Sequence, residues 1–350
     1  MFSELPPESI CIVRLSHIGD TCHALAVVRT IQDTWPETNI TWIIGKTEAS
    51  LMADIPGIEF IIFDKSKGRL AYRELHKTLA NRRFDVALCM HASMRVNRIC
   101  RIIDTPVRLG FDKSRARDFQ WLFTNQRIEA TDRQHVLDGM LSFARHIGVP
   151  ERPLRWDIPL SATNLDFAAR HLTGDQPILV ISPCSTQRSR NFRNWSVENY
   201  SAAANHARNR FGCSVVLTGG PSKLESAYGR RIANIFGPDV INLVGKTSLK
   251  ELLAVIKAAD ALLCPDSGPA HMATAVGTPV IGLYATSNPD RSGPYLSQNS
   301  VVNLYPDAVE QFLGKTPGQL RWGQRVRDPR AMDLIRLGDV NTKIDQIFDI

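Results

Sequence analysis

The stretch that decides the fold is Leu262-Leu-Cys-Pro-Asp-Ser-Gly-Pro-Ala-His271-Met-Ala-Thr-Ala-Val-Gly-Thr-Pro-Val-Ile-Gly-Leu-Tyr284. It predicts an apolar strand, a Ser-Gly turn, a helix and a second apolar strand. Pro269 suits the first turn of the helix, because it has no N–H group to leave unbonded. Ser267 and Gly268 precede it as an N-cap and a residue that allows close approach. A helix that begins where a buried strand ends offers free N–H groups and a partial positive charge, which α/β proteins use to hold phosphates.

This stretch has two interpretations. His271 in the first turn fits an anion, so the first is a site for an anionic ligand such as a nucleotide diphosphate. The second needs no ligand, because Asp-Ser-Gly-Pro is also good turn chemistry for any strand–helix connection. The stretch alone leaves both open.

Length and composition limit the class of protein. A chain of 350 residues suits two domains, and 43% hydrophobic with 22% charged residues is typical of a soluble globular protein. We expect no transmembrane segment and no signal peptide, because no apolar run is long enough and the first residues lack a basic, apolar leader pattern. The seven cysteines are scattered without a Cys-x-x-Cys pair. This predicts reduced core thiols in a cytoplasmic protein and no zinc site.

Strands alternate with helices in the first half. The apolar run 10–13 leads into Arg14-Leu-Ser-His-Ile-Gly-Asp20 and a helix. Asp20 should therefore lie at the carboxyl edge of the sheet, where α/β proteins place their chemistry. A carboxylate near a helix start can also be only a cap. Further strands are expected at 40–44, 59–63 and 84–89, with helices around 48–53, 70–82 and 132–147, and this alternation predicts a parallel sheet covered on both faces.

Positive charge is concentrated in residues 65–133, which hold sixteen Lys and Arg against seven Asp and Glu, a surplus of nine. The net charge of the whole chain is only +7. The segment includes a helix with three arginines along one side and a basic, aromatic loop at 107–121. Such a patch favours an acidic partner, which can be nucleic acid, anionic lipid or a phosphorylated sugar, or it is an ordinary solvated surface.

The second half repeats the alternation. A strand at 178–182 exits into a loop where hydroxyls and cations, among them Ser185, Thr186 and Arg193, suit phosphate oxygens. A strand at 214–218 runs into a Gly-Gly-Pro turn, and a terminal helix is expected at 331–348. No Gly-x-Gly-x-x-Gly follows a strand and no Gly-x-x-x-x-Gly-Lys-Ser/Thr occurs, which argues against nicotinamide dehydrogenases and P-loop NTPases.

Four short motifs, each at the end of a predicted strand, together resemble the heptosyltransferases. These are GT-B glycosyltransferases that use ADP-heptose to build the inner core of lipopolysaccharide. The motifs are Arg14-Leu-Ser-His-Ile-Gly-Asp20, Gly110-Phe-Asp112 with Ala116-Arg117, Arg193-Asn-Trp195, and Asp266-Ser-Gly-Pro-Ala-His271. Residues 120–125 and 134–135 look most like the type I enzymes, which add the first heptose to Kdo.

The resemblance implies an α/β fold of the GT-B type, in which two Rossmann-like, doubly wound parallel-sheet domains face a central cleft. On this basis we expect an N-terminal acceptor-binding domain at 1–155 and an interdomain linker at 156–176. A C-terminal nucleotide-sugar domain would follow at 177–330. A final helix at 331–350 can pack back on the N-terminal domain.

The resemblance also implies an inverting, metal-independent transferase without a cofactor, whose donor substrate is ADP-heptose. Asp20 matches the family's general base and would take the proton from the acceptor hydroxyl. Arg193, where relatives often have lysine, would stabilise the leaving ADP. The loop before Arg193 is longer than in some relatives, which weakens that match. The implied donor-binding set is Ser185, Thr186, Arg193, Glu225, Lys246, Thr247, Asp266, Ser267, Gly268 and His271.

The implied acceptor is Kdo-lipid A at the inner leaflet of the inner membrane, which would make the protein cytoplasmic and membrane-peripheral, with no nucleic-acid partner. The candidate acceptor contacts are Arg14, Ser16, Arg95, Arg98, Lys113, Arg115 and Arg117. Two alternatives stay open. One is a related GT-B transferase with another nucleotide-sugar or a later core acceptor, and the other is a noncatalytic module that binds nucleotide-sugar.

Overall fold

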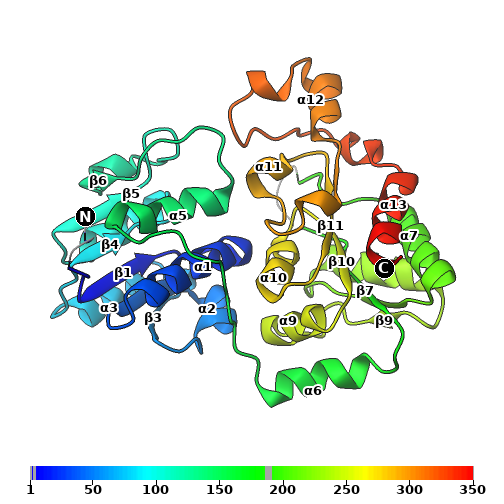
Figure 1. The fold of residues 1–350 in the computed structure, drawn as a ribbon, viewed down its shortest axis with the longest axis horizontal. Helices are drawn as coiled ribbons and strands as arrows, with labels where there is room; N and C mark the ends of the chain where they lie inside the picture. Colours follow the sequence, from blue (N-terminus) through cyan, green and yellow to red (C-terminus); the bar gives the residue numbers. More distant parts are fainter. Residues whose placement is uncertain (1, 3–4, 186–190, 350) are drawn as a thin grey trace. The chain divides into compact units, whose positions relative to one another are not determined.

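The computed structural model describes residues 2, 5–185 and 191–349, and the chain divides into two units, Met1–Pro159 and Leu160–Ile350 (Figure 1). Each unit contains a six-stranded sheet in which every pair of neighbouring strands is parallel. The α/β class expected from the alternating sequence is therefore confirmed.

In the first unit the strand order is β3-β2-β1-β4-β5-β6. The apolar run at 10–13 forms most of β1 and is fully buried, as expected for the centre of a parallel sheet. The strands are β1 (Ser9–Val13), β2 (Asn39–Gly45), β3 (Ile58–Phe63), β4 (Val86–Leu88), β5 (Val107–Gly110) and β6 (Gln126–Arg127). The helices are α1 (Ile18–Thr34), α2 (Lys46–Met52), α3 (Arg69–Leu79), α4 (Met94–Ile102) and α5 (Val136–Ile147).

The first helix, α1, is enclosed by the unit. Every residue from 21 to 31 is buried, and α5 packs against it. The indole N–H of Trp156 donates to the Cys22 carbonyl at 2.9 Å. Arg29 donates in turn to the carbonyls of Trp156 and Asp157. The segment at 156–157 therefore covers α1 and belongs to the first unit.

In the second unit the strand order is β12-β11-β10-β7-β8-β9, so the sequence order reverses between β7 and β10. Its strands are β7 (Ile178–Ile181), β8 (Ser214–Leu217), β9 (Ile241–Asn242), β10 (Ala261–Pro265), β11 (Val280–Tyr284) and β12 (Val301–Asn303). Its helices are α6 (Ala162–His171), α7 (Val197–Phe211), α8 (Lys223–Phe236), α9 (Leu249–Lys257), α10 (Gly268–Val276), α11 (Pro289–Ser292), α12 (Tyr305–Leu313) and α13 (Leu337–Phe348).

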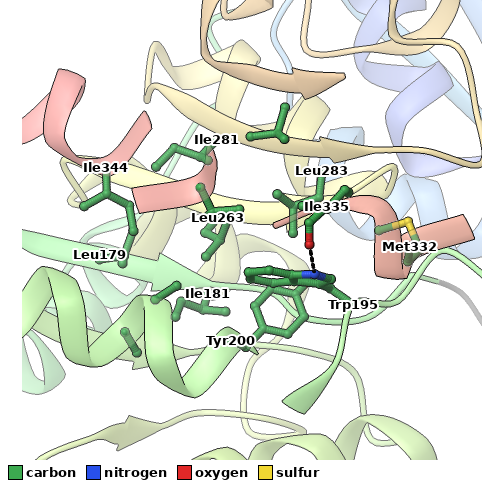
Figure 2. Packing of buried hydrophobic residues seen from close by; sticks show 14 of the residues in the cluster. Leu179, Ile181, Trp195, Tyr200, Leu263, Ile281, Leu283, Met332, Ile335 and Ile344 are labelled. Carbon is green, nitrogen blue, oxygen red and sulfur yellow. Dashed lines mark hydrogen bonds between the residues drawn. The ribbon is translucent and has the colours of Figure 1, made fainter. Parts of the chain in front are cut away.

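The core of the second unit includes the C-terminal segment, as Figure 2 shows. Trp195 is 1% exposed, and its indole N–H donates to the Ile335 carbonyl at 3.1 Å. Val340 and Ile344 of α13 are fully buried in the same cluster. The last helix is thus part of this core.

The range expected as the interdomain linker, 156–176, contains the boundary between the units after Pro159; within it Trp156 covers α1, and α6 packs against α9. Two expectations about the C-terminal segment differ from the structure. The helix expected at 331–348 is a 3-10 turn, Ala331–Leu334, followed by α13. That helix packs against α7 and β12 of its own unit, since its apolar face fills the core there.

All seven cysteines are buried and free. Within residues 2, 5–185 and 191–349, no helix has the length and apolar character needed to cross a membrane. The same residues contain no group of three or more His, Cys, Asp or Glu that could hold a metal ion.

Candidate functional site

The first group of candidate residues lies where β1 ends. Asp20 is in the first turn of α1, three residues after the N-cap His17. The Arg14 guanidinium contacts Asp20 Oδ2 at 2.5 Å, and the His17 backbone N–H donates to the same oxygen at 3.3 Å. The contacts from Arg14 and from the His17 N–H both go to Oδ2, and the Asp20 side chain is 32% exposed. Asp20 therefore has one oxygen held by the protein and one that can accept a proton.

This environment keeps the carboxylate charged. Burial raises the pKa of the Asp20 carboxyl, but Arg14, with help from His17 and His23, outweighs burial and holds that pKa well below its ordinary value. Arg14 itself is 7% exposed, and its second bond, at 2.6 Å, goes to the Met90 carbonyl. Arg14 is expected to contact the acceptor, and the structure places its guanidinium against Asp20.

His91 follows β4, the strand next to β1, so it lies at the same sheet edge. Burial, and then the charge of Arg14, lower the pKa of His91 to about 3, so the imidazole is neutral at physiological pH. Its Nδ1 is buried and finds no hydrogen-bond partner in the described part of the chain. A buried orphan nitrogen at this edge is a polar group that a bound ligand can satisfy.

The expected acceptor-binding cations have different environments. Arg115 pairs with the buried Asp112 and also donates to the Gln134 side chain, so it fastens its own loop. Ser16 is half-buried in the loop after β1. The exposed cations are Arg95 and Arg98 on α4 and Lys113 and Arg117 on the turn after β5, and none has an ion-pair partner among the described residues.

The second group lies at the carboxyl edge of the other sheet, between β7 and β10. Arg193 Nη1 donates to the Asp266 carbonyl at 2.9 Å and to Asp266 Oδ2 at 3.0 Å. Both side chains are close to buried, at 12% and 9% exposure. Arg325 approaches the same carboxylate oxygen at 3.8 Å. Asp266 is thus neutralised by the protein, which removes its repulsion of a bound anion.

The loop after β7 is fastened by amide side chains. Asn191 accepts from Arg193 Nε at 2.8 Å and donates to the Ser185 hydroxyl at 2.7 Å. Asn194 accepts from the Ser185 backbone N–H at 2.9 Å. Ser185, which is 2% exposed, and Arg193, which is partly exposed, are therefore joined in one hydrogen-bond network. Thr186 lies outside the described residues.

Helix α10 begins next to this network. Its N-cap Ser267 has an extended backbone, and its hydroxyl does not cap the helix. The helix starts at Gly268 and Pro269, as the sequence predicts, and His271 in the first turn is 8% exposed. Because the Arg193 guanidinium contacts Asp266, the residue before this N-cap, a cation and a positive helix end converge at one place.

The remaining donor candidates follow two other strands of the same sheet, β8 and β9. Glu225 accepts from the Gly220 N–H at 2.8 Å and from the Ser222 hydroxyl at 2.5 Å, so it orders the turn after β8. Lys246 is exposed and donates to the Asn242 carbonyl at 2.8 Å, and the partly exposed Thr247 follows it. Hydrogen bonds join Ser185 to Arg193 through Asn191, and Arg193 to Asp266 directly. Glu225 lies in the first turn of α8, and Lys246 and Thr247 lie in the loop after β9.

The family is decided by comparison with known proteins. The family model described as Glycosyltransferase family 9 (heptosyltransferase) matches residues 72–313. The chain is also 39% identical over 340 residues to the lipopolysaccharide core heptosyltransferase OpsX of Haemophilus influenzae, which covers 97% of this chain and 96% of that protein. The chain belongs to glycosyltransferase family 9.

Solved structures agree on the fold of this glycosyltransferase. A family 9 glycosyltransferase from Veillonella parvula has a TM-score of 0.78 at 21% identity, covering 99% of this chain and 98% of that one. Escherichia coli ADP-heptose lipopolysaccharide heptosyltransferase II has a TM-score of 0.72 at 18% identity, covering 97% and 98%. The E. coli heptosyltransferase WaaC with ADP has a TM-score of 0.69 at 21% identity, covering 87% and 99%.

Sequence reasoning missed several residues of this glycosyltransferase that contact or adjoin the candidate residues. His91, Asn191 and Asn194 lie in strand-exit loops, and that position was a signal that could have found them. Arg325 had no such signal, because the segment that carries it is irregular and far along the chain from Asp266.

Proposed function

We propose that this glycosyltransferase transfers heptose from ADP-heptose to Kdo of the lipid A inner core, with inversion and without a metal ion. The similarity to the OpsX core heptosyltransferase supports the sugar and the pathway. The observation that carries the proposal is the convergence of Arg193 with the uncapped start of α10 at the carboxyl edge of a parallel sheet. That place suits a nucleoside diphosphate.

On the donor side, the diphosphate would lie against the first turn of α10. The N–H groups there and the Arg193 guanidinium would stabilise the negative charge that develops on ADP as its bond to heptose breaks. The Ser185 hydroxyl accepts from Asn191 and makes a long, 3.4 Å bond to Asn194 Oδ1, which it would exchange for a bond to a phosphate oxygen. With a fixed cation and a helix end at this position, the leaving group would need no divalent ion.

On the acceptor side, Asp20 would act as the base. Its depressed pKa keeps it ionised, and Oδ1 is left to accept the proton of the Kdo hydroxyl. A carboxylate of low pKa is a weak base, so the proton would move late, when the new carbon–oxygen bond has already made that hydroxyl acidic. The new bond forms on the face of the anomeric carbon opposite to the departing ADP, which gives inversion.

The test is ADP release from ADP-heptose with and without Kdo-lipid A, for the wild type and Asp20→Asn. We expect acceptor-dependent release in the wild type that persists in EDTA and falls at least about a hundredfold in Asp20→Asn, while ADP-heptose binding is kept. The control is Glu129→Gln, which removes an exposed carboxylate from the same unit.

Each outcome has a definite meaning. Release from another sugar nucleotide but not from ADP-heptose would overturn the donor. Binding without any release in the wild type would overturn transfer of heptose and favour a module that only binds. Full activity of Asp20→Asn would be consistent with heptose transfer but would reject Asp20 as the general base. Nuclear magnetic resonance of the product's anomeric centre tests inversion.

A further inference from the structure

A short turn in the first unit places three large apolar side chains in solvent. The aromatic turn (residues 117–123) follows β5 and contains a 3-10 helix, Gln120–Leu122. Phe119 is 62% exposed, Trp121 51% and Leu122 61%. Exposed apolar residues are common singly, but three within four positions form a patch that calls for an apolar partner.

The aromatic turn is firmly held, so this exposure is not that of a loose loop. Gln120 is 1% exposed, and its side chain donates to the Cys89 carbonyl at 2.9 Å and accepts from the Phe111 N–H at 3.1 Å. Asn97 of α4 donates to the Asp118 carbonyl at 2.7 Å. Asp118 Oδ2 accepts from the Met94 N–H at the start of α4. The bonds of Gln120 and Asp118 fix the turn, while Phe119, Trp121 and Leu122 stay exposed.

The backbone of the turn is strained where it turns Phe119 outward. Asp118 and Phe119 have φ of 52° and 58°, in the left-handed region that costs most residues other than glycine about 1 kcal/mol or more. Two consecutive residues of this kind are uncommon. The turn therefore holds Phe119 in an exposed position at a conformational cost.

Four cations lie on the aromatic turn or on the segments that adjoin it. Arg117 belongs to it, Lys113 precedes it, and Arg95 and Arg98 lie on α4, whose first turn is bonded to Asp118. All four are exposed, and no described residue forms an ion pair with them. Asp112, next to Lys113 in the sequence, is buried and paired with Arg115.

We propose that the aromatic turn is a membrane anchor, in which Phe119, Trp121 and Leu122 enter the interface of an anionic bilayer while the four cations meet its headgroups. Such an interface is bound by exposed aromatic residues, which enter the headgroup region, together with neighbouring cations, which attract the anionic headgroups. A protein partner would need a complementary acidic surface around an apolar pocket. An anionic bilayer supplies both the negative charge and the apolar phase without that fit.

The inference does not depend on the proposed sugar transfer, because the test omits donor and acceptor. The full chain is centrifuged with vesicles of phosphatidylcholine alone and of phosphatidylcholine mixed with phosphatidylglycerol. We expect binding to the anionic vesicles only, and loss of it in high salt. The variant Phe119→Ser/Trp121→Ser/Leu122→Ser should lower the partition coefficient at least about tenfold, since even one such side chain is worth that much in transfer free energy.

A matched control separates this surface from general hydrophobicity. Leu165, Ile235 and Leu296 are exposed by 45%, 51% and 59% in the second unit, and their triple change to Ser should bind vesicles as the wild type does. Vesicles whose acyl chains are brominated near the headgroup should quench the Trp fluorescence of the wild type, and should quench that of Trp121→Phe less. Circular dichroism confirms that the variants are folded.

Three results would overturn the proposal. The first is equal vesicle binding by the wild type and the aromatic-turn variant. The second is wild-type binding that is as strong to neutral vesicles and insensitive to salt, which would reject the role of the cations. The third is no vesicle binding together with a self-association that the aromatic-turn variant abolishes, which would make the turn a contact between copies.

Discussion

Replacing Arg193 by Met should destabilise the second unit and weaken binding of a nucleoside diphosphate. Arg193 makes three hydrogen bonds, two to Asp266 and one to Asn191, while 12% of its side chain is exposed. The change removes all three and leaves a buried carboxylate. Arg193→Lys is the matched control, because lysine keeps the charge but lacks the planar guanidinium whose Nε and Nη1 reach Asn191 and Asp266.

The expected magnitude follows from the geometry. At 3.0 Å and an effective dielectric constant of about 20, the gross attraction between Arg193 and Asp266 is roughly 5–6 kcal/mol. Desolvation of both charges cancels most of it, but removing one partner of a buried pair usually costs about 3–5 kcal/mol. Arg325, 3.8 Å from the same oxygen, still neutralises part of the charge, so we expect about 2–3 kcal/mol for Arg193→Met.

The assay is urea unfolding of the full chain, followed by Trp fluorescence and circular dichroism, for Arg193→Met, Asp266→Asn and the double variant. The double variant has no unpaired buried charge, so it should lose only about 1 kcal/mol, less than Arg193→Met alone. The free energy of unfolding of Arg193→Lys should lie between those of the wild type and Arg193→Met. ADP binding by calorimetry should weaken in the order wild type, Lys, Met.

Two results would refute this reasoning. If Arg193→Met unfolded at the wild-type urea concentration with the same slope, the pair would contribute nothing to stability. If the losses of the two single variants simply added in the double variant, Arg193 and Asp266 would not be coupled.

Three further changes have defined outcomes. Arg14→Met should move the acidic limb of the pH profile of kcat/KM to higher pH. The active carboxylate is lost as pH falls through the pKa of Asp20, and without the cation burial raises that pKa. An acidic limb at the wild-type pH would contradict this. Gly45→Ala would put a Cβ atom 2.3 Å from the Leu15 carbonyl oxygen, so thermal unfolding should show a loss of about 1–3 kcal/mol, and none would mean that the backbone yields freely. Trp195→Phe leaves a buried carbonyl without its indole donor and should cost about 1–3 kcal/mol in urea unfolding, whereas an unchanged midpoint would show that another donor replaces it.

The long apolar runs made most of the fold predictable. The stretch 262–284 forms the strand, turn, helix and strand expected of it, because Pro and Gly mark the helix ends and both strands are wholly buried. Short or weakly patterned elements were not predictable. β5 has only four residues and lies within the basic loop expected at 107–121. α6 has only one buried residue, Ala168, so it shows little apolar periodicity.

The position of the candidate residues was predictable, but their pairing was not. Because parallel strands end at one edge, the sequence could place Asp20, Arg193 and Asp266 at sheet edges. It could not tell a cation aimed at a ligand from one engaged within the protein. Arg14 and Arg115 looked alike in a basic sequence, yet each is committed to a nearby carboxylate, which is set by loop geometry.

The burial of α13 in the core of the second unit also sets an order of events during synthesis. The first unit has all its strands and helices once residue 159 has been made, so it can fold early. The second unit lacks Val340 and Ile344 until the ribosome has added about 185 further residues, which takes roughly 10–40 s at ordinary rates of elongation. During that interval the nascent chain carries a finished first unit and an open, apolar second one. Chaperones that act on this protein during synthesis should therefore bind the second unit.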